Sequence, residues 1–211
     1  MYKQKRNYEN IQKYKFEGFG KYGIPKIYGV QSCPVTDFIS FNYAKSSSPS
    51  KEKGIHFYID DYQFIRLWSN LDNYIQLFQK YGCILSPDYS LYMDFPVALQ
   101  IYNHYRKHYV AAYCQLHGIT VIPTVCWSDK ESFEWCFDGE PEESVVSVSS
   151  VGTMRNKEAT RAFVEGYKEM ILRLQPSKII FHGDIPDECT GNILHIKKFT
   201  DKFKEAKCDG W

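Results

Sequence analysis

The chain has 211 residues, of which 44% are hydrophobic and 24% charged. This is the composition of an ordinary globular protein and excludes a disordered or fibrous chain. No run of about 18 apolar residues occurs, so we predict no membrane-spanning helix. The formal net charge is +1, but residues 1–23 hold six Lys and Arg against two Glu, and residues 191–211 hold five Lys against three acids. Two basic ends flank an acidic middle, which fits either contacts with nucleic acid or ordinary solvated tails.

The seven cysteines are spread along the chain without a Cys-x-x-Cys pair or the Cys and His spacing of a zinc finger. The polar, basic N-terminus lacks the apolar region of a signal peptide. We therefore expect reduced thiols and a cytoplasmic protein that does not associate with a membrane.

The first quarter of the chain is predicted to contain little regular structure. Residues 1–22 are predicted to be a basic, aromatic N-terminal extension. A short extended segment is expected at residues 23–28, and the alternating residues 38–44 predict a strand. The Ser-, Pro- and Lys-rich residues 45–54 have the composition of a flexible loop.

From residue 55 onward, short apolar strands alternate with amphipathic helices. The strands are expected at residues 55–60, 83–88, 120–125, 144–150 and 178–183. The helices are expected at residues 62–81, 95–117 and 156–174, with a short helix or loop at 129–137 and a basic C-terminal helix within 191–211.

This alternation predicts parallel strands joined by right-handed crossovers, in a single α/β domain at residues 23–190. Seven strands and four or five helices suit a small or incomplete (β/α) barrel-like fold, because a full barrel needs about 250 residues. An open doubly wound sheet is the alternative. The barrel-like form is favoured because no Gly-x-Gly-x-x-Gly follows the first strand.

Polar residues follow nearly every predicted strand, and in either architecture the ligand site lies beyond the carboxyl ends of the strands. The candidates for catalysis at these ends are Asp60, Asp88, Asp129, Asp184 and His182. The carboxylates suit a divalent metal ion or acid–base chemistry, and the imidazole suits proton transfer or metal ligation. The alternative for each aspartate is a helix cap or a turn, and for the histidine a structural role.

The segment from residue 145 to residue 163 passes from a strand through Ser149, Ser150 and Gly152 toward a helix. Small hydroxyls and a glycine let backbone N–H groups approach an anion near a helix start. Together with Gly183 after the next strand, these are the predicted phosphate-binding residues, because the last two strand ends of a barrel often hold phosphate. The alternative is that they only cap and turn the chain.

Four other side chains have a predicted role or position. Tyr89 and Trp127 follow strands and are candidates for stacking on a base or sugar; for Trp127 the alternative is core packing. His104 and His108 are four residues apart on the predicted helix at 95–117, the spacing that binds a metal from one helix face. Because the pair flanks the apolar stripe of that helix, we predict instead that it lies on a solvated face.

A family resemblance rests on four segments: "SPDYSLYMDFP" (86–96), "GITVIPTVCWSD" (118–129), "VSVSSVG" (146–152) and "KIIFHGD" (178–184). Over roughly residues 20–185 the chain resembles the domain of unknown function 4417, a family of uncharacterised bacterial and phage proteins. The resemblance implies a phage or mobile-element context, such as replication, transfer or interference with host defence. It implies no catalytic residue.

Two hypotheses follow. In the first, the protein binds or processes a phosphate-bearing ligand, a nucleotide or nucleic acid, at the carboxyl ends of its strands, as a metal-dependent hydrolase or transferase would. In the second, it is a non-catalytic protein that binds nucleic acid or a host defence protein through its basic ends, its aromatic residues or an acidic face.

Overall fold

The computed structural model describes residue 10 and residues 13–196, and its centre consists of two parallel sheets. The first has the strand order β3-β4-β5-β6, and the second has the order β7-β8-β9. The strands are β3 (Asp37–Ser40), β4 (Lys53–His56), β5 (Cys83–Leu85), β6 (Val121–Ile122), β7 (Val145–Ser149), β8 (Lys178–His182) and β9 (Ile193–Ile196). Every neighbouring pair in both sheets is parallel, which confirms the prediction from the alternation of strands and helices.

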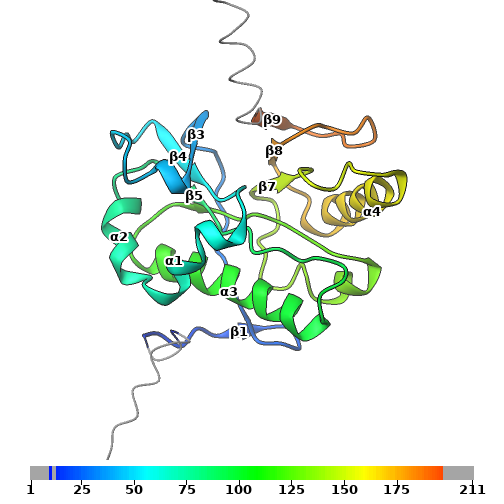
Figure 1. The fold of residues 1–211 in the computed structure, drawn as a ribbon, viewed down its shortest axis with the longest axis horizontal. Helices are drawn as coiled ribbons and strands as arrows, with labels where there is room; N and C mark the ends of the chain where they lie inside the picture. Colours follow the sequence, from blue (N-terminus) through cyan, green and yellow to red (C-terminus); the bar gives the residue numbers. More distant parts are fainter. Residues whose placement is uncertain (1–9, 11–12, 197–211) are drawn as a thin grey trace, which may run out of the picture.

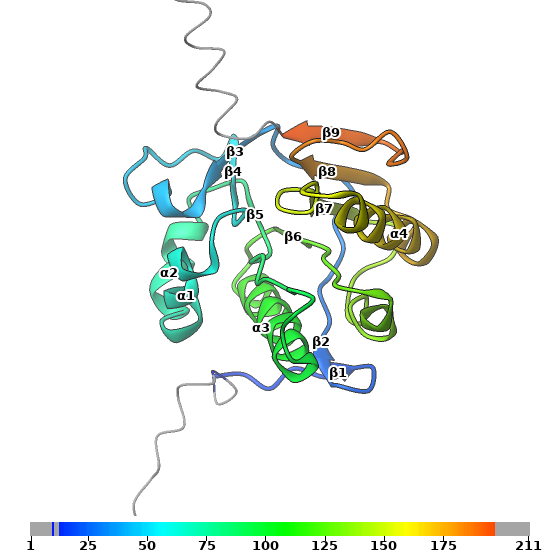
Figure 2. The same cartoon turned by 45° about the vertical axis from the view of Figure 1, so that its right-hand side comes forward.

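The two sheets meet at one residue pair, a parallel bridge between Thr124 and Ser147. Val125 donates its N–H to the Ser147 carbonyl at 2.8 Å, and Ser147 donates to the Pro123 carbonyl at 2.8 Å. The strands therefore follow one another in an arc (Figures 1 and 2). Among the described residues no strand pairing joins β9 to β3. The structure thus shows a mixed α/β fold with mostly parallel sheets and no closed barrel.

Helices cover the outside of this arc (Figure 2). They are α1 (Ile65–Ser69), α2 (Asp72–Phe78), α3 (Val97–Leu116) and α4 (Lys157–Leu174), with the short helices η2 (Phe41–Tyr43), η3 (Asp61–Gln63) and η4 (Lys130–Glu134). The predictions for α3 and α4 are confirmed, but the single helix predicted at residues 62–81 is wrong. It is broken into η3, α1 and α2, because Phe64 (φ −125°, ψ 2°) separates η3 from α1 and Asn70 (φ −138°, ψ 44°) ends α1. Asparagine favours such breaks, since its side chain competes for backbone hydrogen bonds.

The inside of the arc is filled by apolar side chains from both sheets. They are Val35, Phe38, Cys83, Leu85, Ile122, Val145, Ile180 and Ile196. Separate apolar clusters lie between the first sheet and α1–α3, and between the second sheet and α4. The centre of the arc is therefore a packed core.

Both ends of the described chain pack against the fold. The strands β1 (Gly18–Phe19) and β2 (Ile24–Pro25) form an antiparallel hairpin. The Tyr109 hydroxyl on α3 hydrogen-bonds to the carbonyls of Asn10 and Tyr14 at 2.6 and 2.9 Å, so part of the predicted N-terminal extension lies on this helix.

At the other end, residues 193–196 form the strand β9, at the start of the region 191–211 for which a basic C-terminal helix was predicted. The remaining residues of that prediction, 197–211, lie outside the described part, as do residues 1–9 and 11–12. None of the described helices is long and apolar enough to cross a membrane.

A substitution at Gly54 in β4 tests the close packing of the apolar side chains inside the arc. A Cβ at this position would lie 2.5 Å from the Phe38 ring and 3.0 Å from the Cys83 sulfur. Overpacking costs about 1–3 kcal/mol, which outweighs the roughly 0.5–1 kcal/mol that Ala gains over Gly in a strand. Gly54→Ala should therefore lower the free energy of unfolding in urea. In a Phe38→Leu background the added cost should shrink; an equal cost in both backgrounds would contradict the packing described.

Candidate functional site

Five polar side chains lie at or near the carboxyl ends of β4, β5, β7 and β8, and we call them the strand-end cluster: Tyr58, Asp88, Ser147, Ser149 and His182. The Tyr58 and Ser147 hydroxyls are 2.5 Å apart and hydrogen-bonded. The Tyr58 ring stacks on the His182 imidazole, with 4.6 Å between ring centroids. The Ser149 hydroxyl is 3.2 Å from His182 Nδ1. Side chains from both sheets thus meet at one edge of the arc.

Asp88 is the predicted acid whose environment is most altered. Its half-buried carboxyl group follows β5. Its pKa is raised to about 7. Burial is the main cause, the negative charge of Asp61 adds to the rise, and the positive charge of Lys107 acts in the opposite direction. The pKa of Tyr58 is raised as well, by burial first and then by the charge of Asp88. A carboxyl group with a pKa near neutrality both accepts and releases a proton at neutral pH, as a general acid or base must.

The other predicted acids are placed differently. Asp60 is exposed at the start of η3, and its carbonyl accepts the Gln63 N–H at 2.9 Å. The Asp129 carboxylate accepts the Ser132 N–H at 3.1 Å and caps η4, as the alternative interpretation predicted. Asp184 is exposed after β8. In the described part of the chain, no three of the predicted acids have carboxylate oxygens within 4.8 Å of one another, so their shared role in catalysis stays a prediction.

Three of the predicted phosphate-binding residues, Ser149, Ser150 and Gly152, lie at the end of β7 and in the turn that follows it, and Gly183 follows β8. The Ser150 N–H donates to the His182 carbonyl at 3.0 Å, and its hydroxyl donates to the Asp184 carbonyl at 2.5 Å. Gly152 has φ +86°, and Gly183, with φ +97°, lies so close to Ser150 that a Cβ would be 2.7 Å from the serine oxygen. Ser150 is therefore used within the turn.

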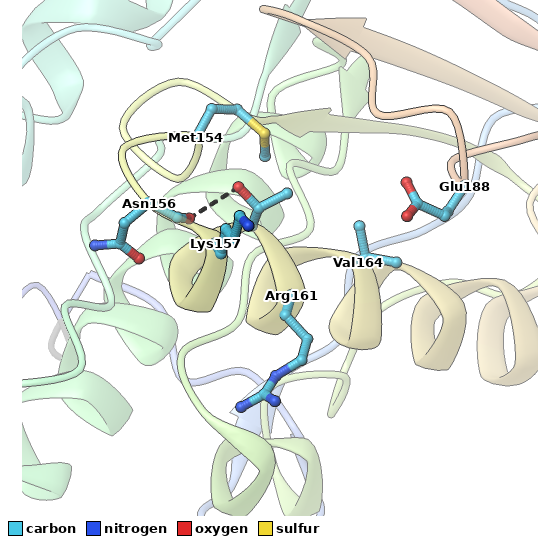
Figure 3. Close-up of a pocket in the computed structure, with 7 residues that line it drawn as sticks. Met154, Asn156, Lys157, Arg161, Val164 and Glu188 are labelled. Carbon is cyan, nitrogen blue, oxygen red and sulfur yellow. Dashed lines mark hydrogen bonds between the residues drawn. The ribbon is translucent and has the colours of Figure 1, made fainter.

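The helix α4 itself starts after this turn. Its N-cap is Asn156, whose side chain accepts the Ala159 N–H at 2.8 Å. A cavity of about 460 Å³ lies over the first turns of α4 (Figure 3). It is lined by Met154, Asn156, Lys157, Thr160, Arg161, Val164 and Glu188. Two cationic side chains and one carboxylate give this cavity a net positive lining.

The two aromatic residues predicted to stack on a ligand pack against protein. Trp127 lies against α4, where a Cβ at Gly166 would be 2.2 Å from the indole nitrogen, and its ring is 5.3 Å from that of Phe163. Tyr89 is buried, with the Arg106 guanidinium 4.2 Å from its ring centroid. The core-packing alternative describes Trp127, and Tyr89 is packed against protein as well, so stacking on a ligand stays a prediction for both rings.

A second polar group, which the sequence interpretation missed, lies on α3. His104 and His108 were predicted to be solvated, but both are fully buried, so this prediction is wrong. His108 Nε2 lies 3.1 Å from Glu140 Oε1, and Lys107 Nζ lies 2.5 Å from the same oxygen. We call His104, His108 and Glu140 the imidazole cluster. The polar face of α3 is dry because the segments containing Pro25 and Glu140 cover it.

The charged and titratable side chains of this buried group shift one another's pKa values. Burial lowers the pKa of His104, and the positive charges of His108 and Lys107 add to this effect. Burial also lowers the pKa of His108, against the influence of Glu140. Burial alone would raise the pKa of Glu140, but Lys107 and His108 bring it below its usual value. Glu140 and Lys107 therefore form a buried ion pair. The spacing of the two histidines hinted at this group, whereas no sequence signal pointed to Glu140.

Comparisons with known proteins supply a family but no chemistry. The model of the domain of unknown function (DUF4417) matches residues 16–200. The Gene 1 protein of Mycobacterium phage D29 is 31% identical over 194 residues, which cover 87% of this chain and 72% of that protein. The Gene 1 protein of Mycobacterium phage L5 is 36% identical over 177 residues, covering 81% and 75%. No solved structure matches.

The raised pKa of Asp88 makes stability depend on pH. Because the folded-state pKa of about 7 lies above the unfolded value of about 3.9, the folded chain holds the extra proton between these values. This contribution is complete below pH 4 and is lost as the pH rises through 7. The wild-type free energy of unfolding, measured against that of Asp88→Asn, should fall by about 2–3 kcal/mol from pH 5 to pH 8. A constant difference across this range would show that the carboxyl group is not perturbed.

Proposed function

Because the chain belongs to the family of the domain of unknown function 4417, whose name states no activity, we propose a function from its side chains. The protein binds and processes a phosphate-bearing ligand, a nucleotide or nucleic acid, at the carboxyl ends of its parallel strands. The observation that carries this proposal is Asp88, a carboxyl group with a pKa of about 7 beside Tyr58 at this edge. In this proposal Asp88 exchanges the proton of the reaction.

The finer fold assignment is part of the same proposal. We infer that the arc is an incomplete (β/α) barrel. Support comes from its apolar filling, in which Val35 and Phe38 at one end of the strand order share a cluster with Ile196 at the other end. In such folds ligands collect at the carboxyl ends of the strands, where the strand-end cluster lies.

The phosphate part of the proposal is supported by the cavity at α4. Its volume, about 460 Å³, falls in the range of small-molecule sites. Lys157 and Arg161 belong to its lining and lie in the first turns of an 18-residue helix, whose N-terminal dipole also favours an anion. The positive lining suits a phosphate group better than a neutral ligand. The phage origin of both relatives agrees with a nucleotide or nucleic-acid ligand.

Turnover is tested with Asp88→Asn. The purified chain is incubated with nucleoside mono-, di- and triphosphates and with short DNA and RNA, each with Mg²⁺ or Mn²⁺, and products are separated by chromatography. Asp88→Asn should lower the rate by about 10²–10⁴-fold, the usual contribution of a general acid or base. The control is Asp94→Asn, a nearby exposed carboxylate, which should keep the wild-type rate. A substrate turned over equally by Asp88→Asn would overturn this role.

Binding is tested separately with Lys157→Ala and Arg161→Ala. Each change removes one cation from the cavity and should weaken nucleotide binding in calorimetry by about tenfold, together with a shallower dependence of affinity on salt. Lys168→Ala, an exposed lysine farther along α4, is the matched control. Equal loss in all three variants would mean that only the general charge of the protein matters. Binding without turnover would favour the non-catalytic hypothesis.

A further inference from the structure

The imidazole cluster contains buried hydrogen-bond acceptors without a donor, which is rare in folded proteins. His104 Nε2 lies 3.1 Å from the Asp138 carbonyl oxygen, and His108 Nδ1 lies 2.9 Å from the Pro25 carbonyl oxygen. A carbonyl oxygen only accepts, so each of these nitrogens carries a hydrogen. In a neutral ring the other nitrogen, Nδ1 of His104 or Nε2 of His108, then presents a lone pair.

One of these lone pairs has no partner, and the other lies beside an acceptor rather than a donor. His104 Nδ1 and Glu140 Oε2 are buried and have no hydrogen-bond partner. His108 Nε2 lies 3.1 Å from Glu140 Oε1. One ligand atom from each of the three residues lies within 4.8 Å of the others. A cation between them would satisfy acceptors that are otherwise buried without a donor.

We propose that His104, His108 and Glu140 bind one divalent transition-metal ion of the zinc type. Two imidazole nitrogens and one carboxylate form a ligand set of known zinc sites, which leave a fourth position for a further ligand. Histidines that bind metals usually donate their other N–H to a carbonyl or carboxylate, and the Asp138 and Pro25 carbonyls take that part here. The site is separate from the proposed nucleotide chemistry and does not depend on it.

The backbone supports this geometry at two places. The four-residue spacing on α3 brings the two imidazoles to one side, with ring centroids 4.3 Å apart. Gly139 has φ +76°, and a Cβ there would lie 2.7 Å from the Pro25 oxygen and 3.0 Å from His108 Nδ1. Only glycine fits this close approach, which places the Asp138 carbonyl and the Glu140 carboxylate on either side of it against the rings.

Lys107 is the group that competes with a metal. Its ammonium lies 2.5 Å from Glu140 Oε1 and 2.8 Å from the Thr124 carbonyl. Lys107 therefore donates to one oxygen of the carboxylate, and the other oxygen, Oε2, remains without a donor. The competing arrangement has a proton on His108 that is donated to Glu140 Oε1. That arrangement leaves His104 Nδ1 and Glu140 Oε2 without partners, whereas a metal uses both. The metal ion and the Lys107 ammonium would place two cations beside the single carboxylate of Glu140. We therefore expect the fourth ligand of the metal to be an anion such as hydroxide.

The test is zinc binding by the full chain after removal of metals with a chelator. Calorimetric titration with Zn²⁺ should give one ion per chain, and X-ray absorption should show nitrogen and oxygen ligands with two imidazoles. His104→Ala should weaken binding by at least the roughly 10–100-fold that loss of an outer-shell partner costs, and His117→Ala, an exposed histidine at the end of the same helix, should not weaken it. Added Zn²⁺ should raise the melting temperature of the wild type and not that of His104→Ala.

His104→Gln serves as a second variant if His104→Ala does not fold, because its side-chain amide can still donate to the Asp138 carbonyl while the imidazole ligand is lost and the Lys107–Glu140 ion pair is kept. Circular dichroism identifies which variants are folded. The proposal is overturned if the folded wild type does not take up zinc in a 1:1 ratio, if X-ray absorption shows sulfur ligands from cysteines, or if zinc affinity is unchanged in the folded variant.

Discussion

The buried ion pair between Lys107 and Glu140 is the interaction on which this structure most depends. Neither side chain is more than 1% exposed. Removing such charges from water costs several kcal/mol for each ion, so the pair is stable only because further polar contacts complete it. Lys107 also donates to the carbonyl of Thr124, the residue that bridges the two sheets. Lys107 thereby connects α3 both to the segment that contains Glu140 and to the Thr124–Ser147 bridge between the two sheets.

The same lysine links the two polar groups of the protein. Its charge acts on Asp88, where it opposes the rise in pKa caused by burial, and it holds the carboxylate of Glu140 in the imidazole cluster. Protonation or ligand binding in one group therefore changes the electrostatic energy of the other, because charges in a dry interior are weakly screened. The strand-end and imidazole clusters are best regarded as two ends of one charged network.

Much of the fold was predictable from the sequence because it depends on local periodicity. The apolar strands and the amphipathic helices α3 and α4 repeat at spacings that any parallel α/β arrangement requires. The broken helix around Asn70 was missed because its apolar residues keep helical spacing across the break. The strand β9 was missed because the charged residues that follow it in the chain suggested a helix, and strand pairing with β8 is a tertiary interaction.

The site was predicted less well, for a physical reason. Asp88 was chosen as a candidate because parallel strands end at a common edge, a rule that needs no knowledge of partners. Tyr58, Lys107 and Glu140 were not among the candidates, since their importance comes from contacts between residues 17 or more positions apart. The burial of His104 and His108 reversed the rule that polar faces of helices lie in water. That rule fails when a chain has enough backbone carbonyls and opposite charges to cover such a face, as the segments around Pro25 and Glu140 do for α3.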